Sequence, residues 1–489
     1  MSQIRIQDLT FAYDGSYDNV FEDVNLSIDT NWKLGLVGRN GRGKTTLLRL
    51  LMGEFTYRGT INAQVEFGYF PYAIDPQEQR LTYELMDELC SGEDEWRWRR
   101  EWNLLEITED ALYRPFCSLS PGERTKAQLA ALFVRENRFL LIDEPTNHLD
   151  VQARDAVARY LNAKKGFILV SHDRKFLDGC VDHILAINKT GFETIHGNFS
   201  SWMRQKQQRD DFERAQNEKL AQQIGHLSAA AKRTAGWSDK IEATKIGQAV
   251  YDRGHVGHQA AKMMKRSKVI EQRRQTAIED KQELLKDIEY ASPLVLRPLL
   301  HHANMLVEAR ELSICYGGQP VFDKLDFTLM QNERVALSGP NGCGKSSMLK
   351  LIAGQDIPHT GELRVASQLK ISYVPQDTSF LSGDLSDYAR ECRIDESLFK
   401  TILRKLDFLR VQFEKDMREF SAGQRKKVLI ARSLCEQAHL YIWDEPLNFV
   451  DVYSRIQIEE LIVEYAPTLL IVEHDRAFLE NVATRQVEF

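Results

Sequence analysis

Two short glycine-rich stretches decide the fold: GRNGRGKTT, which begins at Gly38, and GPNGCGKSS, which begins at Gly339. Both fit the pattern GxxxxGK[ST], in which backbone N–H groups converge on phosphate oxygens at a helix N-terminus. The lysine neutralises the phosphates, and the hydroxyl group that follows it binds magnesium. The alternative, a glycine-rich surface turn, is disfavoured because each stretch lies between an apolar strand-like segment and a helix-like one. We therefore expect two phosphate-binding loops.

The two stretches belong to a duplicated domain. Lys44 lies 99 positions before Asp143, and Lys345 lies 99 positions before Asp444. These aspartates stand in the similar sequences LIDEPTNHLD and YIWDEPLNFVD. Motifs that keep one register at an offset near 301 indicate an internal repeat.

Each copy is expected to be an α/β domain. Apolar segments typical of strands alternate with helix-like segments, which predicts layers around a largely parallel sheet. The expected strands cover 34–37, 139–142 and 167–170 in the first copy, and 335–337, 440–443 and 469–472 in the second. Helices are expected at 46–52 and 347–352, directly after the glycine loops.

The segment between the copies has a different character. Its apolar residues fall at helical spacing, in the series Leu220, Ile224, Leu227, Ala231 and the series Ile270, Ala277, Leu284, Ile288. Both series predict helices packed antiparallel, with a turn at about 236–257, where the glycines lie. The expected organisation is an ATPase domain at 1–202, a helical hairpin at 203–292 and a second ATPase domain at 293–489.

The expected turn is basic. Residues 231–270 contain nine basic and three acidic residues, a net charge of +6, whereas the whole chain carries −7. A basic turn on an acidic body indicates contact with a polyanion. Trp237, Tyr251 and His255 could stack on exposed RNA bases. The alternative is a solvated hairpin whose charges aid solubility.

The sequence predicts a folded cytoplasmic protein. A length of 489 residues predicts two to four domains, and 43% apolar with 28% charged residues is ordinary for a folded protein. No window approaches 18 consecutive apolar residues, and the N-terminus has no secretory signal, so no membrane part is expected. The seven cysteines are scattered without a CxxC pair, which indicates reduced thiols.

Paired acids follow one strand of each copy. Asp143 and Asp444 end apolar strands, where a carboxylate can hold the magnesium shell. Glu144 and Glu445 come next and are candidate general bases for the attacking water. The alternative, a solvated loop after a strand, is weakened by the glycine loop at fixed distance upstream.

Histidines end the next strand of each copy, in LVSHD and IVEHD. A single histidine at such a place is more often structural than catalytic. Because His172 and His474 occupy matching positions, contact with the γ-phosphate is favoured.

A further motif carries a family resemblance. SLSPGE at 118–123 and FSAGQ at 420–424 look like the signature motif of the ABC ATPase superfamily, whose domains dimerise head to tail. The resemblance implies that two ATP molecules bind with Mg²⁺ between the copies. A first ATP would contact Tyr13, Gly38, Asn40, Gly41, Gly43, Lys44, Thr45, Thr46, Asp143, Glu144 and His172, with Ser421, Gly423 and Gln424 of the second copy.

A second ATP would contact the equivalent residues. They are Tyr316, Gly339, Asn341, Gly342, Gly344, Lys345, Ser346, Ser347, Asp444, Glu445 and His474, with Ser120, Gly122 and Glu123 of the first copy. Magnesium would be held by Thr45 and Asp143 in one site, and by Ser346, Gln376 and Asp444 in the other. Tyr13 and Tyr316 stand where the family stacks adenine, although a tyrosine at the edge of a strand is the alternative.

Two departures from the family pattern are informative. The motif that usually ends in glutamine reads YVPQ at Gln376 but YFPY at Tyr72. A tyrosine cannot contact magnesium and water as an amide does, so the first site is expected to be slower or to serve mainly for tight closure. Pro121 and Ala422 replace a signature glycine and are expected to be tolerated.

The whole chain resembles the ABC-F family, in which two cassettes are joined by a helical hairpin. DEPTNHLD, SHDR and HGNFSSW agree with that family, and the equal motif spacing leaves no room for an extra arm in either copy. VYDRGHVG and AAKMMKRSK look like the Lsa and Vga type of antibiotic-resistance proteins.

That resemblance implies ribosome protection. A monomer in its ATP form would bind the ribosomal E site, contacting large-subunit rRNA and the P-site tRNA, and would dissociate on hydrolysis. Lys245, Tyr251 and Arg253 at the hairpin tip would reach toward the peptidyl-transferase centre and displace lincosamides, pleuromutilins and streptogramin A compounds. The alternatives are a translation factor acting without a drug, and an ATPase subunit of a transporter or nucleic-acid repair complex.

Overall fold

The computed structural model describes residues 2–15, 19–75, 77–135, 137–147, 149–188, 191–243, 294–316 and 319–489. One compact unit comprises Met1–Ser200 and Ala291–Phe489, and a second comprises Ser201–Tyr290. Within the first unit, the two copies of the repeat form two similar domains, here called cassette 1 (up to residue 200) and cassette 2 (from residue 294).

Cassette 1 contains two sheets. The larger has the order β5-β6-β7-β3-β8-β9 and is parallel except for β9. Its strands are β3 (Lys33–Gly38), β5 (Glu66–Phe70), β6 (Arg138–Asp143), β7 (Phe167–Val170), β8 (His183–Asn188) and β9 (Gly191–His196). The smaller sheet is antiparallel, in the order β2 (Phe21–Asp29), β1 (Gln3–Phe11), β4 (Arg58–Asn62). All four residues of β7 are buried, as expected for a parallel strand covered on both faces.

Cassette 2 repeats this architecture. Its larger sheet, β14-β15-β16-β12-β17, is parallel throughout its described pairs. The strands are β12 (Arg334–Ser338), β14 (Ile371–Val374), β15 (Leu440–Asp444), β16 (Leu469–Val472) and β17 (Arg485–Glu488). The antiparallel sheet has the order β11 (Gln319–Met330), β10 (Met305–Tyr316), β13 (His359–Val365). The predicted α/β fold around a largely parallel sheet is confirmed, whereas the two small antiparallel sheets were not predicted.

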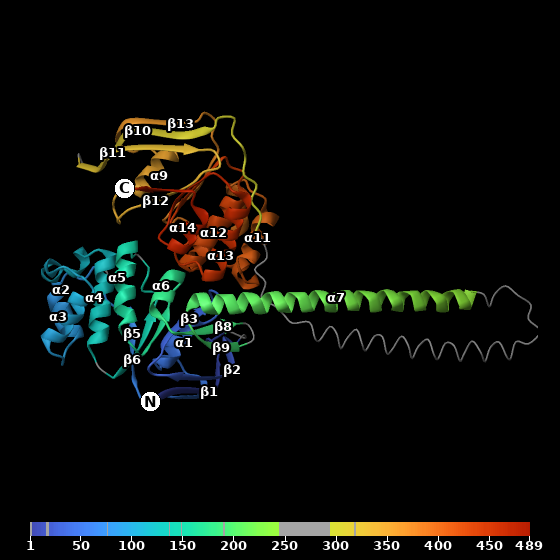
Figure 1. Ribbon diagram of the computed structural model, residues 1–489, viewed down its shortest axis with the longest axis horizontal. Helices are drawn as coiled ribbons and strands as arrows, with labels where there is room; N and C mark the ends of the chain where they lie inside the picture. Colours follow the sequence, from blue (N-terminus) through green and yellow to red (C-terminus); the bar gives the residue numbers. More distant parts are fainter. Residues whose placement is uncertain are drawn as a thin grey trace, which may run out of the picture. The chain divides into compact units, whose positions relative to one another are not determined.

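Helices follow the strands in both cassettes (Figure 1). Cassette 1 has α1 (Lys44–Leu51), α2 (Thr82–Leu89), α3 (Glu95–Leu104), α4 (Pro121–Val134), α5 (Val151–Asn162) and α6 (Arg174–Cys180). Cassette 2 has α9 (Lys345–Ile352), α10 (Leu385–Glu391), α11 (Glu396–Lys405), α12 (Ala422–Cys435), α13 (Val452–Tyr465) and α14 (Arg476–Val482). One core of cassette 1 joins Leu9, Leu36, Leu47 and Leu141, so α1 packs between the two sheets and the glycine loop before it is firmly placed.

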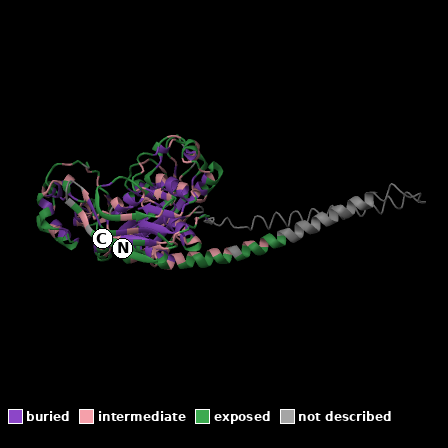
Figure 2. Cartoon of the chain, turned by 90° about the horizontal axis from the view of Figure 1, so that it is seen from above, coloured by how far each residue is buried: buried purple, intermediate pink, exposed green. Residues whose placement is uncertain are grey.

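The second unit contains α7 (Phe199–Ala243), a single helix whose described side chains are mostly exposed (Figure 2). The helix predicted through Leu220 is therefore confirmed, but the predicted turn at about 236–257 begins too early, because α7 continues to Ala243; the rest of that range lies outside the described residues. One glycine inside a helix costs only about 1 kcal/mol, which the alanine-rich run before it offsets. Lys245, Tyr251, Arg253 and the second predicted helix lie outside the described residues. Among the described helices, none is long and apolar enough to cross a membrane.

Candidate nucleotide sites

Both glycine loops have the left-handed backbone that glycine favours. Gly43 has a φ of 85° and Gly344 a φ of 99°. A Cβ atom at Gly43 would lie 2.7 Å from the ring of Phe21, and one at Gly344 would lie 2.7 Å from the ring of Phe322. These two glycines are therefore required both for their conformation and for their close approach to a strand.

The loops place a lysine and open amides at the start of a helix. The Lys44 Nζ atom donates to the Gly38 carbonyl oxygen, and the Lys345 Nζ atom donates to the Gly339 carbonyl oxygen, both at 2.8 Å. Both lysines are buried, and burial lowers the pKa of Lys44. Within the described residues no side chain caps α1 or α9. Their first amides are therefore available to a phosphate group.

A hydroxyl group meets a carboxylate beside each loop. The Thr45 hydroxyl donates to Asp143 Oδ2 at 2.7 Å, and the Ser346 hydroxyl donates to Asp444 Oδ1 at 3.1 Å. The other oxygen of Asp444, Oδ2, is buried and has no hydrogen-bond partner among the described residues. Burial raises the pKa of Asp444 to about 6. A buried oxygen without a donor, next to a hydroxyl, fits a magnesium ion, which prefers oxygen ligands.

The candidate bases share a strained backbone. Glu144 has a φ of 51° and Glu445 a φ of 47°, values that residues other than glycine rarely adopt. The predicted histidine lies beside each glutamate. The His172 Nε2 atom lies 3.2 Å from Glu144 Oε1, and the His474 Nε2 atom lies 3.6 Å from Glu445 Oε1. Strain of this kind concentrates at functional sites, and here both copies retain it.

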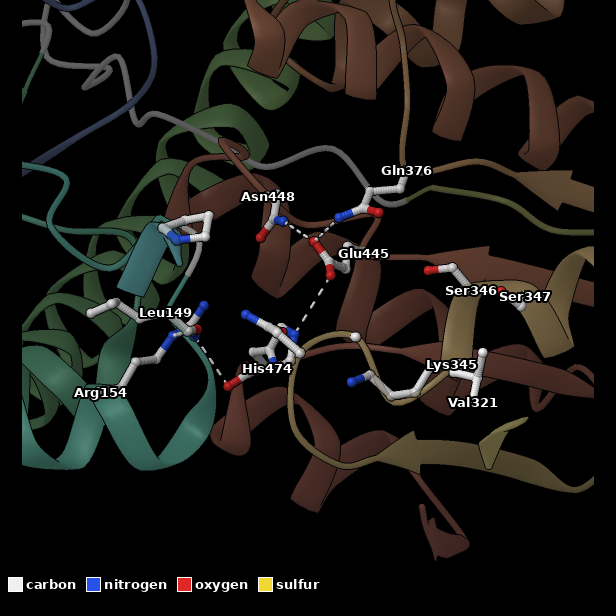
Figure 3. A pocket seen from close by; sticks show the side chains of 14 residues that line it. Leu149, Arg154, Val321, Lys345, Ser346, Ser347, Gln376, Glu445, Asn448 and His474 are labelled. Atoms are coloured by element: carbon white, nitrogen blue, oxygen red, sulfur yellow. Dashed lines mark hydrogen bonds and ion pairs between the residues drawn. The ribbon is translucent and has the colours of Figure 1, made fainter. Parts of the chain in front are cut away.

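Amides hold only one of the two glutamates. In cassette 2, Gln376 Nε2 donates to Glu445 Oε2 at 2.9 Å, and Asn448 Nδ2 donates to the same oxygen at 2.5 Å (Figure 3). In cassette 1, Glu144 Oε1 is buried and has no hydrogen-bond partner among the described residues. The environment of the two carboxylates therefore differs although the backbone is the same.

The pKa values follow this difference. Burial raises the pKa of Glu144 to about 7, and the nearby Asp143 adds to the effect. Burial also acts to raise the pKa of Glu445, but contact with His474 and the Gln376 hydrogen bond outweigh it, so that this pKa is lowered. Near neutral pH, Glu445 is ionised and Glu144 is partly protonated.

Tyr72 does not take the place of the missing glutamine. Its backbone N–H donates to Gln128 Oε1 at 3.0 Å, and its side chain is half-buried. Burial raises the pKa of Tyr72, and the charges that act on it come from Cys90, Arg138 and Arg135. No hydrogen bond joins Tyr72 to Glu144 in the described part of cassette 1. Instead the Tyr69 hydroxyl donates to Asp143 Oδ2 at 3.2 Å.

Each glycine loop lies against the other cassette. The Asn40 Nδ2 atom donates to the Phe449 carbonyl oxygen at 2.9 Å, and a Cβ atom at Gly423 would lie 3.1 Å from the same nitrogen. The second glycine loop faces Leu149 across a cavity of about 430 Å³ (Figure 3). That volume is within the range of small-molecule sites. Pro121, Asn341, Ser347, Gln376, Glu445 and His474 also line this cavity.

The remaining predicted contacts are placed as follows. Ser120 and Glu123 form a reciprocal capping box at the start of α4, and Ser421 and Gln424 do the same for α12. These side chains therefore orient the helix ends that face the opposite glycine loops. The Tyr13 hydroxyl lies 2.7 Å from the Thr46 hydroxyl, and the residue as a whole is 45% exposed, as a stacking residue needs to be. The side chain of Tyr316 lies outside the described residues.

Sequence reasoning missed two residues of the second site. Asn448 holds Glu445, and Arg154 of cassette 1 reaches the main chain of His474. A signal existed for Asn448, because the repeat has an asparagine at the matching position, Asn147. The repeat likewise has an arginine at the position that matches Arg154, namely Arg455, but nothing in the sequence indicates the contact with His474, which is 320 positions away.

Comparisons with known proteins agree with this geometry. The family model described as "ABC transporter" matches residues 21–147 and 322–448. The chain is 29% identical to the Ribosome protection protein VmlR of Bacillus subtilis (strain 168), over 97% of this chain and 85% of that protein. It is 25% identical to the Energy-dependent translational throttle protein EttA of Haemophilus influenzae, over 96% of this chain and 89% of that protein.

A solved structure shows the same fold. The archaeal ribosome recycling factor aABCE1, in complex with the ribosomal stalk protein aP1, superposes with a TM-score of 0.64 at 20% identity. The match covers 98% of this chain and 87% of that chain. At this identity the likeness concerns the tandem architecture alone.

Proposed function

Because the chain belongs to the ABC transporter family and hydrolyses ATP, we propose that ATP and Mg²⁺ bind at the two sites described above. Lys44 and Lys345 would neutralise the β- and γ-phosphates. Thr45 with Asp143, and Ser346 with Asp444 and Gln376, would hold the metal. Bound magnesium would neutralise the developing phosphate charge. Phe449 and Gly423 beside Asn40, and Pro121 beside the second loop, support sites completed by the opposite cassette.

Hydrolysis is proposed to occur chiefly at the second site. Glu445 would accept a proton from the attacking water, since it is ionised and is held by two amides. His474, whose ring lies beside Glu445, would contact the γ-phosphate. No side-chain amide holds Glu144 among the described residues, so the first site would serve mainly for tight closure.

The pH dependence of the first site provides a test. In a Glu445→Gln variant, the residual turnover should depend on Glu144, whose pKa is raised to about 7. A base acts only when deprotonated, so this residual turnover should rise as the pH increases through about 7 and then level off. Phosphate release would be measured between pH 6 and 9, with the Glu144→Gln single variant as the control, because its turnover should show no such rise near pH 7.

For the chain as a whole, we propose an ABC-F protein that binds the ribosome and protects it from large-subunit antibiotics. The observation that carries this proposal is the similarity to a ribosome protection protein over 97% of the chain, which includes both cassettes and the linker. The net charge of +6 in residues 231–270 supports contact between the linker and rRNA. The chain is proposed to bind at the E site, beside the P-site tRNA, so that the linker reaches toward the drug site. The linker residues proposed to lie nearest that site are Lys245, Tyr251 and Arg253.

Ribosome binding can be tested with a hydrolysis-deficient protein. The Glu144→Gln, Glu445→Gln double variant should sediment with ribosomes in the presence of ATP and magnesium, since ATP would keep the cassettes closed. Expression of the unaltered chain should raise tolerance to lincosamides, pleuromutilins and streptogramin A compounds. Sedimentation with membranes and not with ribosomes would contradict the proposal and favour a transporter subunit.

A translation factor that acts without a drug is the second candidate. The similarity to EttA, a translational throttle protein, favours this candidate, and it extends over 96% of the chain. Ribosome binding with unchanged drug tolerance would support this candidate over ribosome protection.

A further inference from the structure

Arg154 links the two cassettes at the second site. It is the fourth residue of α5 in cassette 1, and only 9% of it is exposed. Its Nε atom donates to the Leu149 carbonyl oxygen at 3.0 Å. Its Nη1 atom donates to Asp173 Oδ2 at 2.8 Å and to the main-chain oxygen of His474, in cassette 2, at 3.1 Å. The last bond is drawn in Figure 3.

The main chain around His474 is held from two directions. Its N–H donates to Glu473 Oε2 at 2.9 Å, from within cassette 2. Its carbonyl oxygen accepts from Arg154, from cassette 1. The position of the main chain sets where the imidazole lies, and that ring stands 3.6 Å from Glu445. The orientation of the ring beside Glu445 therefore depends partly on a side chain of the other cassette.

The matching arginine of cassette 2 behaves differently. Arg455 donates to Asp475 Oδ2 at 3.0 Å and to the carbonyl oxygens of Val450 and Leu447 at 2.9 Å. All three partners belong to its own cassette. Both arginines thus pair with the aspartate after the histidine, but it is Arg154 that hydrogen-bonds across to the other cassette's histidine. Of these two matching arginines, the one that bonds across the cassettes serves the site whose glutamate is held by side-chain amides.

From this geometry we infer that Arg154 is a positioning residue for hydrolysis at the second site, acting from cassette 1 through the main chain of His474. The inference rests on the proposed roles of Glu445 and His474. A contact made by the opposite cassette exists only while the cassettes are paired. Arg154 therefore makes alignment of the second site conditional on closure, and a displacement of about 1 Å in such a site can cost roughly 100-fold in rate.

The test separates positioning from folding by using two backgrounds. In a Glu144→Gln protein, where turnover comes from the second site, Arg154→Ala should lower kcat by roughly 10- to 100-fold and leave KM within about twofold. In a Glu445→Gln protein, the same change should alter the residual turnover by less than about twofold. Equal losses in the two backgrounds would overturn the inference, because they would indicate a general structural defect.

Two further variants complete the design. Arg154→Lys can keep the ion pair with Asp173 and should therefore keep the melting temperature. A lysine lacks the planar guanidinium group that donates to all three acceptors, so the variant should still lower kcat. Asp155→Ala removes an exposed ion pair to Arg476 that also crosses between the cassettes, and it should leave kcat unchanged. A normal kcat in Arg154→Lys would refute the inference.

The assay uses the purified full chain without ribosomes, so it is independent of the sedimentation and drug experiments. Unchanged turnover in Glu445→Gln alone would refute the catalytic assignment, and the role of Arg154 with it.

Discussion

Replacing Glu445 with Gln should lower steady-state ATP turnover of the full chain by at least about 100-fold, the usual contribution of a general base. The same change at Glu144 should leave turnover within about threefold of the unaltered protein. The reason is that the two equivalent glutamate side chains have different hydrogen-bond partners. Gln376 and Asn448 orient Glu445, and contact with His474 and the Gln376 hydrogen bond lower its pKa. Glu144 has no side-chain amide partner among the described residues, and its pKa is raised to about 7.

The two variants are matched controls for each other, because they make one chemical change at equivalent positions of the repeat. Phosphate release would give the turnover, and retention of radiolabelled ATP after gel filtration would show trapping. Glu445→Gln should retain more ATP than Glu144→Gln. Equal loss of turnover in both single variants would contradict unequal sites. A melting temperature for each variant would exclude unfolding as the cause.

The fold and the phosphate-binding parts of both sites could be predicted because local sequence determines them. A glycine with a φ of 85° and a lysine at the start of a helix require particular residues at particular spacings, and those are visible in the chain. The same holds for Thr45 with Asp143, which meet at 2.7 Å as their motif predicts. Apolar runs such as β7 likewise indicate strands buried on both faces.

Contacts that depend on tertiary structure could not be predicted. The substitution of Tyr72 for glutamine was visible, but its neighbours could not be predicted, because Gln128 of α4 and Cys90, the residue after α2, come from distant parts of the sequence. The pairing of Arg154 with His474 joins two cassettes and has no local pattern. Gly236 was expected to end a helix, yet the helix continues, since one glycine is a weak signal against many helix-forming neighbours.

Asp451→Ala should be the most destabilising single change near the sites, at about 3–5 kcal/mol in the free energy of unfolding. The Lys427 Nζ atom donates to Asp451 Oδ2 at 2.6 Å, and both side chains are almost fully buried. Asp451 also caps α13 by accepting from the Ser454 N–H at 3.0 Å. Among the described residues, its removal would leave the buried charge of Lys427 with the Leu406 carbonyl oxygen as its one remaining acceptor.

Asp150→Ala is the matched control, because Asp150 caps α5 in cassette 1 through the Ala153 N–H at 2.8 Å and no ion pair joins it to a described residue. Loss of a cap alone should cost about 1 kcal/mol.

The Lys427 charge holds the pKa of Asp451 below its ordinary value, so the stabilisation from the ion pair is complete above about pH 4 and is lost as the pH falls through the lowered pKa. Urea unfolding at pH 7 should therefore show the full difference between the two variants. A Lys427→Met change added to Asp451→Ala should recover part of the loss, because it removes the unpaired charge. Equal destabilisation by Asp150→Ala and Asp451→Ala would mean that the buried pair contributes nothing beyond the cap.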